Sequence, residues 1–243
     1  GGWVLETSLT GAFGSSLNGS TKMGGIFFSG SSVVYGDLTS GTADRLKVNW
    51  FTSSSLGWGS RNQSTINSGT DYLQFETNWA YDSGTSKGLV HGLNNIKEIQ
   101  YNHGTSQWEV YRTHPEKTNA EAVFLAYQDG VVAIGYSGMG YRGLGTSTPV
   151  GEVNIIHPDS QTNTIKAPDQ DFIDGFGTSI DFSGSYMAIG APNFDITFNS
   201  SERELISNDK GAAYLYKIDS DQSGSSDWAS IQRKIYTRVE NPR

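Results

Sequence analysis

Cysteine is absent from this chain of 243 residues, which excludes disulfides, thiolate metal sites and a cysteine nucleophile. Clustered positive charge is absent too, because the formal net charge is −8 and Arg233-Lys234 is the most basic run. A protein that binds the phosphate backbone of a nucleic acid needs a surface with clustered Lys and Arg residues, so we expect no nucleic-acid partner. No apolar run approaches the ~18 residues of a spanning helix, so we expect no membrane insertion.

Helix signals are also missing, since no stretch of ten or more residues combines a 3.6-residue apolar period with an N-terminal cap. Glycine is abundant instead, with 30 residues, and it joins Ser, Thr and Asn between short runs of β-branched and aromatic residues. Many brief strands have this distribution. The composition therefore predicts an all-β fold.

A repeated hairpin pattern runs through the chain. Three segments align without a gap, and each reads as an aromatic residue, a turn, an apolar strand and a glycine: 28–36, 127–135 and 182–190. A fourth copy, 66–76, fits with one extra residue and has Glu76 in place of the glycine. Apolar strands around a pair of residues that tolerates a tight turn predict β-hairpins.

Each hairpin is followed by a polar loop of variable length and by further strands. Third strands are predicted at 45–51, 96–101, 152–156 and 212–218. Weaker fourth strands follow at 57–62, 107–112, 162–166 and 227–232. Each unit is therefore about four antiparallel strands.

Four-stranded units bury both faces only by stacking around an axis, so we predict a β-propeller of about four antiparallel four-stranded blades. The approximate units, within one domain at 1–243, are 11–62, 63–115, 119–168 and 172–236. The opening run 3–7 resembles the outer strand near 227–231, which leaves one strand more than four blades need. The alternative is that this chain is part of a larger propeller.

Phe176-Gly177, followed by Gly190-Ala191-Pro192, resembles the signature of the FG-GAP repeat, the blade unit of integrin-α-like and bacterial β-propellers. The strand at 211–216 and the later Trp228 also resemble the bacterial branch of that family. The resemblance is specific over 172–236. It implies a propeller that binds proteins or glycans, generally outside the cytoplasm.

The resemblance also implies calcium in an Asp-rich loop between the first two strands of a blade. Here that loop is as short as Ser183-Gly184, which cannot supply the six or more oxygens that calcium takes. The run 219–224 does match the start of a calcium loop, but Ser230 stands at the twelfth position, where an acid belongs, and only Asp227 could substitute. We predict no cofactor, with calcium at 219–224 as the alternative.

Signals for catalysis are weak. The run 138–143 matches a dinucleotide fingerprint, but 144–149 cannot form the helix that this motif requires. No Gly-x-Ser-x-Gly elbow is present, and the four histidines lack metal-ligand spacing: His91, His103, His114 and His157. Carboxylates that could converge across blades for glycan hydrolysis are Glu76, Asp82, Glu152 and Asp195. We predict that the protein is not an enzyme.

The loops that follow the second strand of each unit are the predicted binding surface. They vary in length while the strands do not, and exposed aromatic and arginine side chains anchor recognition. The candidate partner-binding residues are Trp79, Tyr81, Tyr141, Arg142, Phe194 and Phe198. The alternative is that these aromatic side chains cover the edges of the blades.

These observations favour a non-catalytic binding or adhesion propeller that recognises a protein or glycan. Its low charge and its many Ser, Thr, Asn and Gly residues resemble those of proteins exposed on microbial or viral surfaces. The predicted location is therefore extracellular, on a cell surface or on a virion. The second hypothesis is a structural subunit of a virion or cell-surface assembly, such as a fibre, tail or coat component, and the third is a glycan-active enzyme.

Overall fold

Antiparallel β-strands make up the regular structure of the protein in a computed structural model. The structure describes residues 22–29, 32–39, 45–54, 57–58, 62–65, 79–92, 95–115, 117, 123–136, 151–166, 175–192, 211–218 and 229–236. Within these ranges there is no helix, and hence none that could cross a membrane. The all-β prediction is confirmed.

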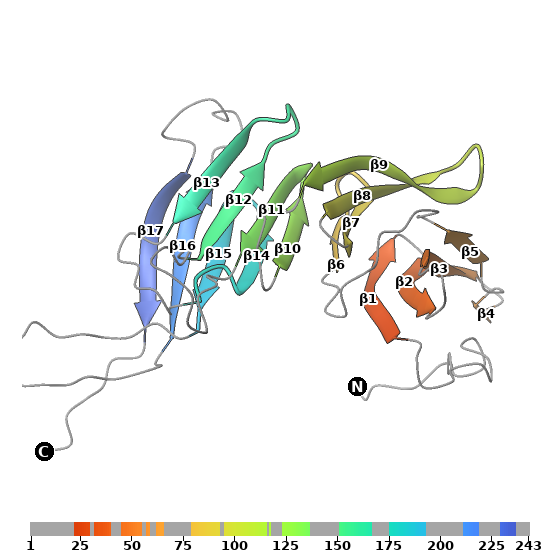
Figure 1. The fold of residues 1–243 in the computed structure, drawn as a ribbon, viewed down its shortest axis with the longest axis horizontal. Helices are drawn as coiled ribbons and strands as arrows, with labels where there is room; N and C mark the ends of the chain where they lie inside the picture. Colours follow the sequence, from red (N-terminus) through yellow and green to blue (C-terminus); the bar gives the residue numbers. More distant parts are fainter. Residues whose placement is uncertain are drawn as a thin grey trace, which may run out of the picture.

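The strands form four sheets that follow one another along the chain (Figure 1). The first sheet holds β1 (Lys22–Ser29), β2 (Ser32–Thr39) and β3 (Arg45–Ser54), with the short β4 (Gly57–Trp58) and β5 (Asn62–Thr65) both paired to β3. The second holds β6 (Trp79–Asp82), β7 (Lys87–Gly92), β8 (Asn95–Asn102) and β9 (Gln107–Pro115).

The third and fourth sheets have the same order of strands as the second. The third holds β10 (Val123–Gln128), β11 (Val131–Tyr136), β12 (Glu152–Ile156) and β13 (Thr162–Lys166). The fourth holds β14 (Ser179–Ser183), β15 (Tyr186–Ala191), β16 (Ala212–Ile218) and β17 (Ala229–Tyr236). Every pairing is antiparallel between successive strands, as the repeat predicts.

Tight turns create the hairpins that open these sheets. Asp129 and Gly130 both have positive φ, at 51° and 80°, which is the type I′ geometry whose twist matches that of the flanking strands. The turn between β14 and β15 consists of Gly184 and Ser185, and of these two residues only Gly184 has a positive φ, 58°. A positive φ at the first turn position is what a type II′ turn requires. The hairpins predicted at 28–36, 127–135 and 182–190 are confirmed by the strand register.

The hairpin predicted at 66–76 lies outside the described residues. The first two strands of the second sheet are β6 and β7, joined by a four-residue turn. The fifth residue of the second strand is Gly36, Gly135 or Gly190 in the other sheets, but it is His91 here. A longer turn and a histidine at the glycine position concealed this copy of the repeat.

Adjacent sheets pack face to face through three hydrophobic clusters. Val34, Val48 and Trp50 of the first sheet pack on the second, Leu89 and Ile96 of the second pack on the third, and Ala133, Val153 and Ile155 of the third pack on the fourth. The third sheet uses alternate residues of β11 for its two faces, because side chains alternate along a strand. Each inner sheet therefore buries both faces.

The first strand of each sheet lies at the same side of this stack. β1 contacts β6, β6 contacts β10, and β10 contacts β14 (Figure 1). The sheets thus fan out from a common line of first strands. Within the described part of the chain, the four sheets do not close into a ring.

Candidate functional site

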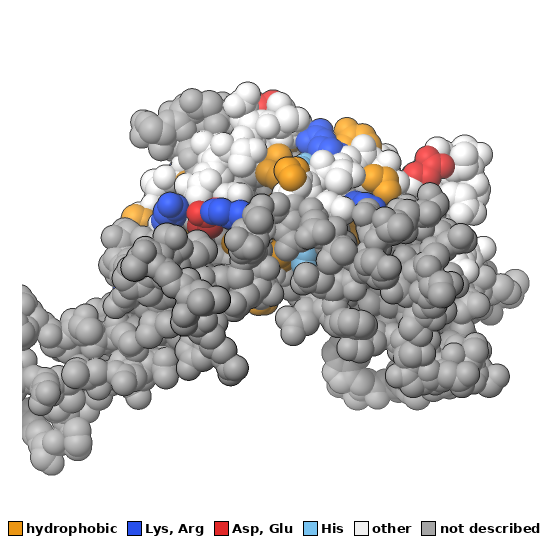
Figure 2. Space-filling view, in the orientation of Figure 1, with side chains coloured by type: hydrophobic (Ala, Val, Ile, Leu, Met, Phe, Trp, Pro, Cys, Tyr) orange, Lys and Arg blue, Asp and Glu red, His pale blue; other side chains and the backbone are white. Residues whose placement is uncertain are grey.

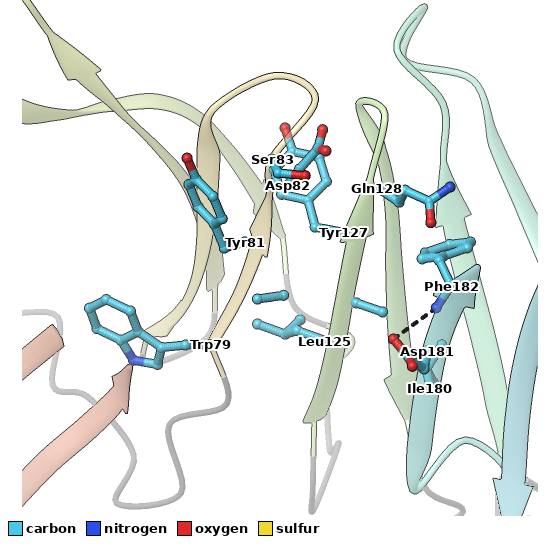
Figure 3. Close-up of a pocket in the computed structure, with 12 residues that line it drawn as sticks. Trp79, Tyr81, Asp82, Ser83, Leu125, Tyr127, Gln128, Ile180, Asp181 and Phe182 are labelled. Carbon is cyan, nitrogen blue, oxygen red and sulfur yellow. Dashed lines mark hydrogen bonds between the residues drawn. The ribbon is translucent and has the colours of Figure 1, made fainter. Parts of the chain in front are cut away.

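A groove of about 370 Å³ runs across the first strands of the second, third and fourth sheets (Figure 3). Its lining comes in consecutive runs of residues, at 79–83, 125–128 and 180–182. In the described sheets β6, β10 and β14 are end strands, each paired on one side only.

Side chains add aromatic and polar groups to the rims of this groove. Trp79 and Tyr81 lie on the side of β6 that faces away from β10, where they pack against the cluster of the first and second sheets, and Phe182 lies near Gln128 between β10 and β14 (Figure 3). These four side chains are half-buried, and Ser83 at the rim is exposed. Half-buried rings can contact the apolar faces of a ligand while amides and hydroxyls bond its polar groups. The groove thus offers aromatic and polar surface, and its lining includes the exposed carboxylate of Asp181.

Asp82, the last residue of β6, ties this strand to the third sheet. It is 2% exposed, and its carboxylate accepts hydrogen bonds from Gly84 N–H (2.9 Å), the Thr85 hydroxyl (2.6 Å) and Gly130 N–H (2.8 Å). Burial by itself would raise the pKa of Asp82, but the Thr85 and backbone hydrogen bonds outweigh it and hold the pKa below its usual value. Donors from the protein itself therefore already bind this carboxylate.

Gln128 makes the same kind of connection one sheet further on. It is the last residue of β10, as Asp82 is of β6, and its Nε2 donates to the carbonyl oxygen of Gly184 at 2.9 Å. Gly184 lies in the turn between β14 and β15. Two equivalent contacts therefore link three successive hairpin turns and constrain the rim of the groove.

A buried polar network lies behind the groove wall. The Tyr127 hydroxyl donates to Glu98 at 2.9 Å, and His114 Nε2 donates to the same carboxylate at 2.6 Å. Burial, followed by the charge of Glu98, raises the pKa of Tyr127 well above its usual value. Burial would raise the pKa of Glu98, yet the hydrogen bonds from His114 and Tyr127 lower it overall. These groups join the second sheet to the third, so they serve packing.

Phe176 and Gly177 form the junction between the third and fourth sheets. Phe176 is fully buried, and its ring meets the ring of Tyr214 edge-on at 5.3 Å between centroids. Gly177 has a φ of 91°, which glycine adopts readily, and its N–H donates to Gly190 at 3.0 Å. A Cβ added at Gly135 would lie 2.2 Å from the Gly177 carbonyl oxygen. The Phe176-Gly177 pair therefore packs closely against the preceding sheet, where Gly135 leaves room for the Gly177 carbonyl group.

The family model described as FG-GAP repeat matches residues 160–216. This segment is similar to an FG-GAP repeat. It takes in β13, β14, β15 and β16 as far as Tyr216, so the FG-GAP repeat spans the outer strand of one sheet and three strands of the next. The family resemblance seen in the sequence is confirmed. A search among curated proteins found no match to the chain.

FG-GAP repeats generally build integrin-like propellers with binding or adhesion roles, and they are typically extracellular. The FG-GAP segment contributes β14 and the lining residues Ile180, Asp181 and Phe182 to the groove. The groove is therefore built partly from the FG-GAP repeat and partly from the two preceding sheets.

The predicted partner-binding residues fall into two groups. Trp79 and Tyr81 line the groove, but they lie in β6 and not in a loop after a second strand, so that part of the prediction is wrong. The first hairpin of the second sheet, β6 and β7, lies where the sequence predicted a loop. The others lie outside the described residues: Tyr141, Arg142, Phe194 and Phe198.

Several groove residues were not predicted as part of a binding surface. Asp82 was named only as a carboxylate for catalysis, whereas Gln128 and Phe182 were part of the repeat alone. The missed signal was positional, because Asp82 and Gln128 both end the first strand of a sheet. Sequence cannot show that these strand ends meet, because the sheets must first stack.

The other predicted chemistry is only partly visible. In the described residues no three His, Asp or Glu side chains are grouped as metal ligands require. The calcium candidate at 219–224 and the run 138–143 lie outside those residues, as do Glu76 and Asp195. Glu152 is buried and bonded to Lys117. Each described member of the proposed carboxylate set therefore has a structural partner.

Proposed function

We propose that this protein is a non-catalytic binding or adhesion module of the β-propeller type, which recognises a glycan or protein ligand outside the cytoplasm. The observation that carries the proposal is the groove across three first strands, where residues of β6, β10 and β14, among them Gln128 and Phe182, form one lining. Hydroxyl-rich ligands can form hydrogen bonds with the polar groups of such a lining without introducing charge. Support from the family comes from the FG-GAP match.

Charge favours a neutral ligand. The chain carries a formal net charge of −8, which repels sulfated or phosphorylated molecules at long range. Among the described side chains visible in Figure 2, basic and acidic residues are interspersed between uncharged ones. We therefore expect a neutral glycan as the preferred ligand, with a protein ligand as the alternative.

The experiment fills the groove and leaves its packing in place. Ser83→Trp puts a large side chain at an exposed rim position, and Thr113→Trp is the matched control on exposed β9, away from the groove. Fluorescent full chain is incubated with a neutral-glycan array and with intact cells. Loss of binding in Ser83→Trp but not in Thr113→Trp is expected, and equal binding by both would contradict the proposal.

Enzymatic treatment of the cells separates the two ligand classes. If glycosidase treatment removes binding, the ligand is a glycan, and if only protease treatment removes it, the ligand is a protein. If neither cells nor array retain the wild-type chain, the binding proposal fails.

A second candidate function is a structural subunit of a surface assembly. The observation in its favour is the outer face of the fourth sheet, where Tyr186 is 45% exposed and Ile235 is 56% exposed. Large exposed apolar side chains in one sheet mark contact surfaces. Ordered particles or fibres of the full chain in electron micrographs would support this role, and a monodisperse species of low mass would count against it.

A further inference from the structure

The outer face of the fourth sheet repeats the pattern of faces that are covered elsewhere. Ala133 and Ile155 form a cross-strand pair in the third sheet and pack on the fourth. Ala188 and Leu215 are the equivalent pair one sheet later. Ala188 is exposed and Leu215 is half-buried, although their counterparts are completely buried. This face has the residues of an interface, and none of the described sheets packs on it.

The second row of the face shows the same equivalence. Val153 pairs with Ile165 in the third sheet, and Ala213 pairs with Ile235 in the fourth. Ile235 is 56% exposed, whereas Ile165 is 6% exposed. Apolar side chains thus occupy the interface positions on both rows.

The face differs from the covered ones by a pair of charges. The row of Ala188 and Leu215 begins with Asp181 on β14 and ends with Arg233 on β17. In the third sheet the place of Asp181 is taken by Ala126, which is buried. A further sheet of the same kind packed here would bury an unpaired carboxylate, at a considerable desolvation cost.

A second copy of the chain solves this problem by symmetry. When two such faces meet about a two-fold axis that runs parallel to the strands, β14 of one copy faces β17 of the other. Asp181 of each copy then faces Arg233 of the other, and Ala188 faces Leu215. The charges pair and each small residue meets a large one. We propose that the outer face of the fourth sheet is a two-fold interface between two copies of this protein.

The dimer is expected to be weak. Strands spaced ~4.8 Å apart, with residues ~3.4 Å long, give four strands of five residues a footprint of roughly 300 Å². Standard interfaces bury about 800 Å² on each partner, so a dissociation constant on the order of micromolar is expected. Because two ion pairs lie at the ends of the row, dissociation rises with salt.

Sedimentation equilibrium of the full chain, from about 1 to about 300 µM, tests the interface. Wild type is expected to approach twice the 26.4 kDa chain mass as concentration rises. Asp181→Arg and Arg233→Asp each bring like charges together, so each is expected to weaken self-association by about tenfold or more. Lys166→Asp on exposed β13 is the control, with association unchanged.

Charge rescue makes the test specific. An equimolar mixture of the Asp181→Arg and Arg233→Asp chains is expected to dimerise, because each unlike pair is then restored across the two-fold axis. The double variant is expected to dimerise with itself for the same reason. Wild type that stays monomeric throughout, single reversals without effect, or failure of both rescues in chains with wild-type circular dichroism would overturn the proposal.

Discussion

Asp82 at the end of β6 accepts a hydrogen bond of 2.8 Å from the N–H of Gly130, in the turn of the next sheet. A carboxylate of one blade-like unit thus completes the turn of another. The contact aligns β6 with β10, the two strands that form one side of the groove. One residue therefore contributes both to the contact between the second and third sheets and to the shape of the groove.

Removing the Asp82 carboxylate should destabilise the protein. Asp82→Ala leaves three donors without their acceptor, and we expect the free energy of unfolding to fall by about 3 kcal/mol, since hydrogen bonds to charged groups contribute ~1.5–3 kcal/mol each and are not additive. Urea denaturation of the full chain measures it. Asp159→Ala, in an exposed turn, is the control with a loss below about 1 kcal/mol. Similar losses in both variants would contradict the stabilising role of the hydrogen bonds that Asp82 accepts.

Acid should unfold the protein through Asp82 and Glu98. Both pKa values are lowered in the folded state, so the stability that these carboxylates supply is complete above their unfolded pKa values, near 4, and is lost as pH falls through the lower folded values. Stability should thus be level from pH 7 to about 5 and fall steeply below about 4. Urea midpoints measured from pH 7 to about 2.5 show this.

The variant Glu98→Gln separates this effect from general acid destabilisation. It should be less stable than wild type at pH 7, because the buried pairing with His114 and Tyr127 is weakened. Its stability should then change less than that of wild type between pH 5 and about 3, since one titrating group is gone. Parallel pH curves for the two proteins would rule Glu98 out as a source of the acid sensitivity.

Glycine at position 135 should be indispensable for stacking the third and fourth sheets. Gly135→Ala places a methyl carbon 2.2 Å from the Gly177 carbonyl oxygen, and backbone cannot yield as a flexible side chain does. We expect a loss of about 3 kcal/mol or more, as for severe overpacking. Gly184→Ala meets no atom within 4 Å and has only a φ of 58° to oppose it, so about 1 kcal/mol is expected. Equal thermal shifts would refute the close-approach argument.

Calcium should not stabilise this protein. The two-residue hairpin turns at Asp129-Gly130 and Gly184-Ser185 supply too few oxygens, and the run 219–224 lacks the acid at its twelfth position. We expect the same melting temperature in EDTA as in millimolar calcium, by differential scanning calorimetry. A rise with calcium that disappears in Asp219→Asn would locate a site in the 219–224 run after all.

The hairpins were predictable because their information is local. A turn pair between β-branched or aromatic residues predicts strands whose register the turn itself determines, as at Asp129-Gly130. In the second sheet β8 and β9 match the strands predicted at 96–101 and 107–112, but the hairpin of β6 and β7 was missed, because its four-residue turn and His91 replaced the local signals. The FG-GAP resemblance rested on Phe176-Gly177, whose burial between sheets explains why that pair is needed there.

The sequence by itself determined the all-β class, the antiparallel strands of the repeated units and the similarity of the last unit to an FG-GAP repeat. These follow from turn chemistry and apolar patterning, which act over a few residues. Only the tertiary structure decided that β6, β10 and β14 line one groove, and that Asp82 closes a turn 48 residues away. Those relationships arise when sheets pack face to face, and packing joins residues whose separation along the chain leaves no local pattern.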